Sequence, residues 1–256
     1  GPLGAMAGGG NPLLALHAGG AAPDEDGPAQ AASLVSDIAA LFAPEARAAW
    51  PQEAGGDIQR PSGPARWLPR VRPSHAVPGE LGLFMSGDCP AGRVAALYPG
   101  TVFDASDLGV MHRHVLPGNG YVVARRDGIL LDGRPGPPSE QVFAMACARD
   151  LAKGRRVVTV AENPWAVGHR ANHPPEGQLD NIRLAPLDLT AADVSRIGAE
   201  WLPNANFRLP ADGDFALRTV VMVAKADIRH GEELLLDYRL TSDPEARPAW
   251  YSPVRR

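Results

Sequence analysis

Three short segments carry tyrosine, asparagine and histidine side chains that could take part in a transfer reaction. They read LYPGT with Tyr98, RANH ending at Asn172 and His173, and LLLDY ending at Tyr238. A phenol can position a nucleophile, an asparagine amide both donates and accepts hydrogen bonds, and a histidine can donate from one ring nitrogen while accepting at the other. The same residues are also common in structural roles, as buried tyrosines with satisfied hydroxyls and as Asx turns. The residue types alone leave both interpretations open.

Two histidines and two cysteines are weaker candidates for chemistry. His112 and His114 would share one face of a strand, but no third ligand follows at a spacing typical of a metal site. Cys89 and Cys147 can form at most one disulfide, cannot make a four-thiolate zinc site, and lack the flanking signature of a nucleophilic cysteine. We therefore predict no bound metal. So few cysteines suit a reducing compartment.

Composition and charge argue against several classes of protein. The 256 residues include 45% hydrophobic side chains, which suits one globular domain with appendages. The formal net charge of −4 disfavours a protein dedicated to duplex DNA, so we expect no sequence-specific DNA binding. Neither a secretory signal peptide nor an apolar run of about 20 residues is evident. We therefore expect no membrane partner, and a nuclear or cytoplasmic location.

From residue 80 onward the chain has the texture of a β-rich protein, because short apolar runs alternate with glycine, proline and aspartate. The expected strands are 81–85, 93–103, 121–125, 128–132, 157–161 and 216–224. Arg126 and Asp127, followed by Gly128, predict a hairpin between two of these strands. No G-x-G-x-x-G motif follows a strand, which argues against a doubly wound nucleotide-binding fold. The predicted fold class is mostly β with short helices (α+β).

Three helices are expected beside these strands. Apolar residues recur with helical spacing over 33–42, and this helix should end at Ala43 because Pro44 follows. A second helix is expected over 139–153. Thr190 resembles the start of a third, with Asp193 at the capping-box position.

The N-terminal part divides into shorter sections of different composition. Residues 1–6 (GPLGAM) resemble the remnant of a cleaved tag, and residues 7–32 are low in complexity, so we expect disorder there. Residues 33–75 form a helical, arginine-bearing extension with no carboxylate between Asp57 and Glu80. Its arginines after Asp57 are Arg60, Arg66, Arg70 and Arg72. They form either a patch that faces an acidic partner or a solvated linker.

Four segments, taken in order, resemble the SET-domain protein lysine methyltransferases. They are ELGLF at 80–84, LYPGT at 97–101, VGHRANH at 167–173 followed by Asp180-Asn181, and DIRHGEELLLDY at 227–238. The likeness covers residues 76–241, the expected catalytic domain. It implies a β-clip of small curved sheets, in which the Asn-His strand and the tyrosine-bearing segment cross in a rare threaded, pseudoknot-like arrangement. It also implies S-adenosyl-L-methionine as cofactor and a protein or peptide lysine as substrate, a histone tail being one candidate.

The resemblance assigns roles to individual residues. Tyr238 would be the catalytic phenol at the end of a lysine channel, and Tyr98 a second catalytic tyrosine that also contacts the substrate. The tail at 242–256 would cover the cofactor, with Tyr251 closing the channel on the substrate; the alternative is an untethered terminus. The residues expected to hold the cofactor are Glu80, Leu81, Gly82, Arg170, Asn172, His173 and Trp250. The residues expected to belong to the framework are Asn181, Asp132 and Gly100.

The chain departs from the usual SET pattern at several positions. Glu80 stands where the first glycine of Gly-x-Gly is usual, Pro174 and Pro175 replace Ser-Cys after the Asn-His pair, and Leu184 stands where some members carry a further tyrosine. No cysteine cluster follows Tyr238 in this sequence, so we expect no zinc-bound tail of the kind found in many histone methyltransferases. These departures leave open a weak or silent SET-like module that binds peptide or cofactor without turnover. Methylation of a non-lysine or non-histone acceptor is a third interpretation.

Overall fold

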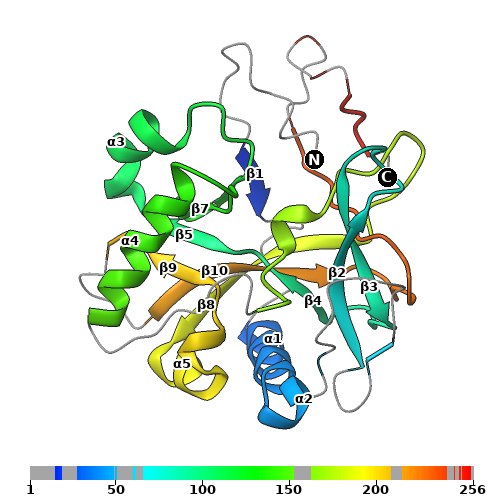
Figure 1. The fold of residues 1–256 in the computed structure, drawn as a ribbon, viewed down its shortest axis with the longest axis horizontal. Helices are drawn as coiled ribbons and strands as arrows, with labels where there is room; N and C mark the ends of the chain where they lie inside the picture. Colours follow the sequence, from blue (N-terminus) through cyan, green and yellow to red (C-terminus); the bar gives the residue numbers. More distant parts are fainter. Residues whose placement is uncertain are drawn as a thin grey trace.

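The strands form small, separate sheets. The computed structural model describes residues 15–18, 28–48, 50, 60, 61, 66–152, 163–208, 215–240, 245, 248 and 250–254. Within this part of the chain, the sheets have the strand orders β1-β6-β7-β5-β9, β4-β10-β8 and β2-β3. The strands are β1 Ala15–Ala18, β2 Trp67–Pro73, β3 Leu81–Gly87, β4 Val94–Leu97, β5 Gly100–Phe103, β6 Val122–Arg125, β7 Leu130–Asp132, β8 Ile182–Thr190, β9 Asn204–Asn206 and β10 Phe215–Ala224. This arrangement confirms the mostly-β α+β class (Figure 1).

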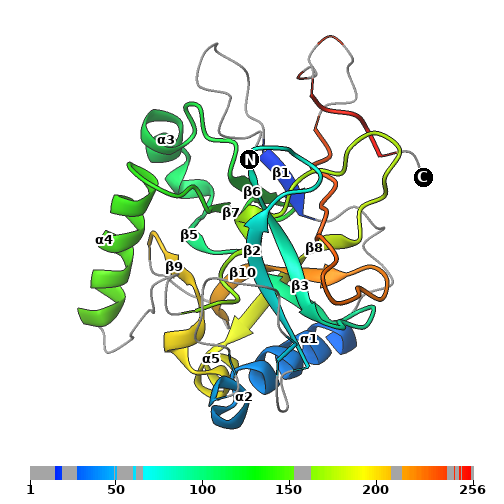
Figure 2. The same ribbon diagram turned by 45° about the vertical axis from the view of Figure 1, so that its right-hand side comes forward.

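Short helices surround these sheets. They are α1 Pro28–Leu41, α2 Pro44–Ala48, η2 Ala105–Asp107, α3 Leu108–Val110, η3 Met111–Val115, α4 Ser139–Ala152, η4 Gly168–Arg170, α5 Ala191–Ile197 and η5 Ala199–Trp201. Figures 1 and 2 place α1, α2 and α5 together at one end of the molecule, with α3 and α4 along one side and the C-terminal tail at the other end. In the described residues, no helix is long and apolar enough to cross a membrane.

The first helix is longer than its apolar spacing indicates. It begins at Pro28, so part of the section predicted to be disordered is helical, and the short strand β1 also lies in that section. Proline suits the first position of a helix because its fixed φ is already helical and its missing N–H has no partner there. The apolar face packs as predicted, with Leu34, Val35, Ile38 and Leu41 buried.

The run expected to form one strand over 93–103 is two strands in two sheets. β4 pairs with β10, whereas β5 pairs with β7 and β9. The break falls at Pro99, which cannot donate a ladder hydrogen bond. Gly100 completes the change of direction with φ 122°, and a Cβ there would lie only 1.9 Å from the backbone oxygen of Asp132. The turn therefore requires glycine, which supports the framework role predicted for it.

Several other predicted elements are present in the structure. The β6–β7 hairpin is confirmed, and α5 begins with the predicted capping box, in which the Asp193 N–H donates to Thr190 Oγ1 at 3.2 Å. The helix expected over 139–153 is α4. The strand expected over 157–161 lies outside the described residues.

The prediction of a strand around His112 and His114 is wrong, because both histidines lie in the helical segment η3, where they are exposed. Asp104 begins this helical run from 105 to 115 with a capping box, which favours helix over strand. No group of three potential metal ligands occurs among the described side chains, and both cysteines are free thiols.

Candidate active site

The segment with the Asn-His pair and the segment that ends at Tyr238 lie side by side. The Leu236 N–H donates to the Asn172 carbonyl at 2.9 Å, and the Tyr238 N–H donates to His173 Nδ1 at 3.2 Å. The Tyr238 hydroxyl donates to the carbonyl of Ala171 at 2.8 Å. Two stretches that are distant in the sequence therefore meet at the tyrosine hydroxyl, as the motifs had indicated.

The buried carboxylate of Glu233 holds this crossing together. Its Oε1 accepts from Ser74 Oγ at 2.6 Å, and its Oε2 accepts from the backbone N–H groups of His75 and Ala76 at 2.8 and 3.0 Å. The Asn172 amide reaches the same Oε1 at 3.4 Å. One carboxylate thus joins the turn after β2, the Asn-His segment and the C-terminal segment.

Gly82 leaves room for this carboxylate. A Cβ at position 82 would lie 2.3 Å from Glu233 Oε1, a distance at which the two atoms cannot coexist. The glycine of the ELG motif therefore permits the close packing of Glu233. This observation explains the residue type without invoking a ligand.

Asn172 and His173 hold protein segments with their side chains. The Asn172 amide donates to the Leu81 carbonyl and to Ser74 Oγ, both at 3.0 Å. His173 accepts the Tyr238 N–H at Nδ1, so its Nε2 carries the proton that binds the Ser252 carbonyl at 2.7 Å. The histidine therefore ties the C-terminal tail to the strand crossing.

The described tail residues pack around His173. The ring centroids of His173 and Tyr251 are 4.5 Å apart, and those of Tyr238 and Trp250 are 6.2 Å apart. Tyr251 is buried and Trp250 is partly buried against the main core. The alternative of an untethered terminus with two exposed aromatic residues is therefore wrong for these residues.

Three tyrosines gather near the crossing. The Tyr98 hydroxyl donates to the backbone oxygen of Tyr121 at 2.8 Å. Burial raises the pKa of Tyr98 well above its ordinary value of 10, and charges on Asp132, Tyr238 and Tyr121 would add to this effect. Burial also raises the pKa of Tyr238. Both phenols are therefore protonated at neutral pH and act as oriented dipoles, not as bases.

Tyr121 is a candidate site residue that the sequence did not reveal. Burial raises its pKa, while the charge of Arg170 lowers it and that of Glu80 raises it. Two residues predicted to hold a cofactor therefore lie within electrostatic reach of this phenol. The tyrosine begins an ordinary apolar strand sequence, YVVAR, which carries no signal of a functional role.

Leu184 lies in the core of the protein, in the same cluster as Tyr98 and Tyr238. It sits in β8 opposite Met222 of β10 and is buried in the main core. Asn181 supports the framework as predicted, because its side chain accepts the Leu235 N–H at 2.8 Å and donates to the Glu233 carbonyl at 2.9 Å.

His169 should make the stability of the folded protein depend on pH. Burial, followed by the charge of Arg170, lowers the pKa of His169 to about 3, and its Nδ1 is buried without a hydrogen bond. The unfolded chain, with a histidine pKa near 6.5, binds the proton first as the pH falls. Stability should therefore decline below pH 6.5, by up to about 1.4 kcal/mol per pH unit from this group.

Urea denaturation of wild type and His169→Gln at pH 7 and pH 5 checks this expectation. We expect the variant to lose less stability between the two conditions than wild type does. His112→Gln, a change at an exposed histidine, is the control and should keep the wild-type pH dependence. Equal acid losses in wild type and His169→Gln would show that His169 does not carry the effect.

Comparison with known proteins identifies relatives. No family model matches the chain. Over 172 residues it is 29% identical to SET domain-containing protein 9 from Homo sapiens and to the protein of the same name from Pongo abelii. The likeness is to the SET-domain family. The match covers 64% of this chain and 56% and 61% of the two relatives, so it spans a little over half of their length.

The SET-domain likeness agrees with the geometry at the level of the fold. Small open sheets, the close approach of the Asn-His and tyrosine segments, and a tail packed on the histidine all suit it. The individual site assignments remain predictions. Tyr98, Tyr238, His173, Trp250 and Tyr251 lie together, and Glu80 and Arg170 lie near Tyr121.

Proposed function

We propose that this SET-like chain transfers a methyl group from S-adenosylmethionine to the amine of a lysine side chain in a protein or peptide. The observation that carries the proposal is the position of the Tyr238 hydroxyl, which lies at the crossing of the two motif segments and within electrostatic reach of two further tyrosines. Aromatic side chains and carbonyl groups around one hydroxyl suit a reaction that develops positive charge on carbon.

The residues present fit S-adenosylmethionine in three respects. The guanidinium of Arg170 has no ion pair among the described residues, which suits a ligand carboxylate. His169 Nδ1 is a buried polar atom without a partner beside it. The partly buried Trp250, whose ring contacts His173 and Tyr238, offers a flat apolar surface to a purine.

The chemistry expected of this site needs neither a metal nor a covalent enzyme intermediate. S-adenosylmethionine, when bound, supplies a methyl group activated by a positively charged sulfur. The chain must orient a neutral amine in line with that methyl group and exclude water. The lysine ammonium, with an ordinary pKa near 10.4, must first lose a proton, and both an apolar channel and a nearby positive charge favour that loss.

Each described group has a part in this scheme. Tyr238 and Tyr98, kept protonated by burial, direct their oxygen lone pairs and ring edges without acting as bases. The Ala171 carbonyl fixes the Tyr238 hydroxyl, and its own partial negative charge stabilises positive charge nearby. His173 keeps the tail against the site, which limits access of water.

Cofactor binding is the first expectation to test. S-adenosylhomocysteine at 100 times its Kd should stabilise the protein by about 2.7 kcal/mol, which appears as a rise in Tm. Trp250→Ala should weaken binding about tenfold because it removes the aromatic surface offered to the adenine. Isothermal titration calorimetry of both proteins measures the two constants.

Met145→Ala is the matched control for this experiment, because Met145 is exposed on α4. It should bind the cofactor as wild type does. Wild-type affinity in Trp250→Ala would remove the tail from the binding site. Absence of any thermal shift in wild type would contradict the proposal that a cofactor binds.

A second candidate function is a SET-like module that binds without turnover. It is favoured by the side chains of Asn172 and His173, whose hydrogen bonds are made within the protein. Incubation with labelled S-adenosylmethionine, histones and a cell lysate distinguishes the methyltransferase from the module that only binds. Labelled protein supports the methyltransferase, and cofactor binding without any label supports the silent module. A labelled acceptor that is not a lysine would assign the third interpretation.

A further inference from the structure

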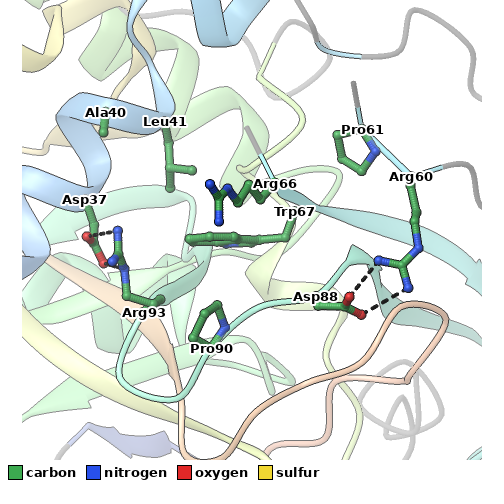
Figure 3. A pocket seen from close by; sticks show the side chains of 10 residues that line it. All are labelled: Asp37, Ala40, Leu41, Arg60, Pro61, Arg66, Trp67, Asp88, Pro90 and Arg93. Atoms are coloured by element: carbon green, nitrogen blue, oxygen red, sulfur yellow. Dashed lines mark hydrogen bonds and ion pairs between the residues drawn. The ribbon is translucent and has the colours of Figure 1, made fainter. Parts of the chain in front are cut away.

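A pocket lies at the junction of the N-terminal extension and the SET-like region. It has a volume of about 670 Å³ and lies between the end of α1, the start of β2 and the loop that follows β3 (Figure 3). Leu41, Trp67 and Pro90 provide apolar surface, and Asp37, Arg66 and Arg93 provide charge. None of these residues belongs to the candidate active site.

Ion pairs account for most of the charge in this pocket. Arg93 pairs with Asp37 at 2.6 Å, and Arg60 forms a two-point pair with Asp88 at 2.6 and 3.3 Å. Arg66 lines the same pocket and is exposed, and it has no carboxylate partner among the described residues. Counting only the residues that the structure describes, the pocket therefore keeps one guanidinium without a carboxylate partner.

An apolar surface lies beside this guanidinium. Trp67 is anchored by its indole N–H, which donates to the Val94 carbonyl at 2.9 Å, and the Arg93 guanidinium lies 5.5 Å from its ring centroid. Figure 3 shows Trp67 between the two ion pairs. Trp67 is itself buried, so it forms an apolar wall of the pocket together with the exposed Pro90. Such a wall next to a guanidinium without a described carboxylate partner suits a ligand that joins an anionic group to an apolar one.

The pocket is separated from the candidate active site by the length of the β2–β3 sheet. Trp67 pairs with Gly87 at the pocket end, whereas Arg72 pairs with Gly82 at the site end. Strands of this length span about 20 Å. The pocket and the candidate active site therefore lie at opposite ends of this sheet.

We propose that this pocket binds an acidic side chain of a partner polypeptide, whose carboxylate pairs with Arg66 while a neighbouring apolar side chain packs near Trp67. The planar guanidinium matches a carboxylate with two parallel hydrogen bonds. Because Arg93 and Arg60 are already paired with Asp37 and Asp88, the pocket offers only the Arg66 charge among the described residues, which suits an isolated carboxylate better than a polyanion such as nucleic acid. The proposal does not depend on methyl transfer.

Fluorescence anisotropy with the full chain tests this proposal. The probe is a short fluorescein-labelled peptide of alternating glutamate and leucine, and its glutamine-for-glutamate counterpart is the comparison. We expect the glutamate peptide to bind more tightly, and Arg66→Ala to weaken it roughly tenfold, as expected for loss of a charge-assisted pair. Arg113→Ala, at an exposed arginine in η3, should bind like wild type.

The other outcomes would overturn the proposal. Equal binding by Arg66→Ala and wild type would remove Arg66 from the site, and equal losses in both arginine variants would indicate charge attraction without a defined pocket. Full competition by inorganic phosphate would assign a small-anion site, and tighter binding of duplex DNA than of peptide would assign a nucleic acid. Thermal melts of both variants confirm that each is folded.

Discussion

Tyr238→Phe should lower methyl transfer by about a hundredfold or more while leaving the protein folded. The substitution removes only the hydroxyl, which the structure fixes on the Ala171 carbonyl at 2.8 Å. Removing one oriented dipole from a reaction centre commonly costs this much in kcat. The loss of one buried hydrogen bond should lower the free energy of unfolding by about 1 kcal/mol. Transfer of label from S-adenosylmethionine to acceptor proteins measures the rate.

Tyr251→Phe is the matched control for this variant, because it removes a phenol from the same aromatic cluster but from the tail. We expect it to lose much less activity than Tyr238→Phe. Unchanged labelling by Tyr238→Phe would show that the assigned phenol is wrong. Loss of cofactor binding in the same variant would instead indicate a structural role for the hydroxyl.

Glu233→Ala should cause the largest loss of stability, about 3–5 kcal/mol. The variant leaves Ser74 Oγ and the backbone N–H groups of His75 and Ala76 without their acceptor. It also opens the junction that aligns Asn172, so cofactor binding should fall with stability. Leaving buried polar groups without their charged partner costs this much free energy because no water can take the place of the partner. Urea denaturation at neutral pH measures the change.

Glu232, the residue before Glu233, provides a control because it is also a glutamate. Glu232 is exposed and accepts hydrogen bonds from Asn181 and Arg229 at the surface. Glu232→Ala should therefore cost about 1 kcal/mol or less. Equal losses in the two variants would show that Glu233 is not the group that holds the crossing.

Much of the fold, and the meeting of the Asn-His and tyrosine segments, could be predicted from the sequence. Short apolar runs on either side of Arg126-Asp127-Gly128 predict the β6–β7 hairpin, and the capping box predicts the start of α5. The Asn-His and tyrosine segments were recognised because their residue types and order together are uncommon. The break at Pro99 was missed because apolar residues continue on both sides of it.

The contacts within the site could not be read from the sequence. Glu233 meets Ser74 across 159 positions, so its role depends on how the turn after β2 packs against the C-terminal segment. Gly82 was assigned to a cofactor loop, yet the close Glu233 carboxylate already explains it. Tyr121 has neighbours from other segments, and the Arg66 pocket combines three separate parts of the chain.

A structure with S-adenosylhomocysteine bound tests the central claim most directly. We expect the sulfur to face the Tyr238 hydroxyl, the carboxylate to lie near Arg170 and the adenine to lie beside Trp250. A ligand bound on another surface, or side chains that fill the space in front of Tyr238 while the ligand is bound elsewhere, would contradict it.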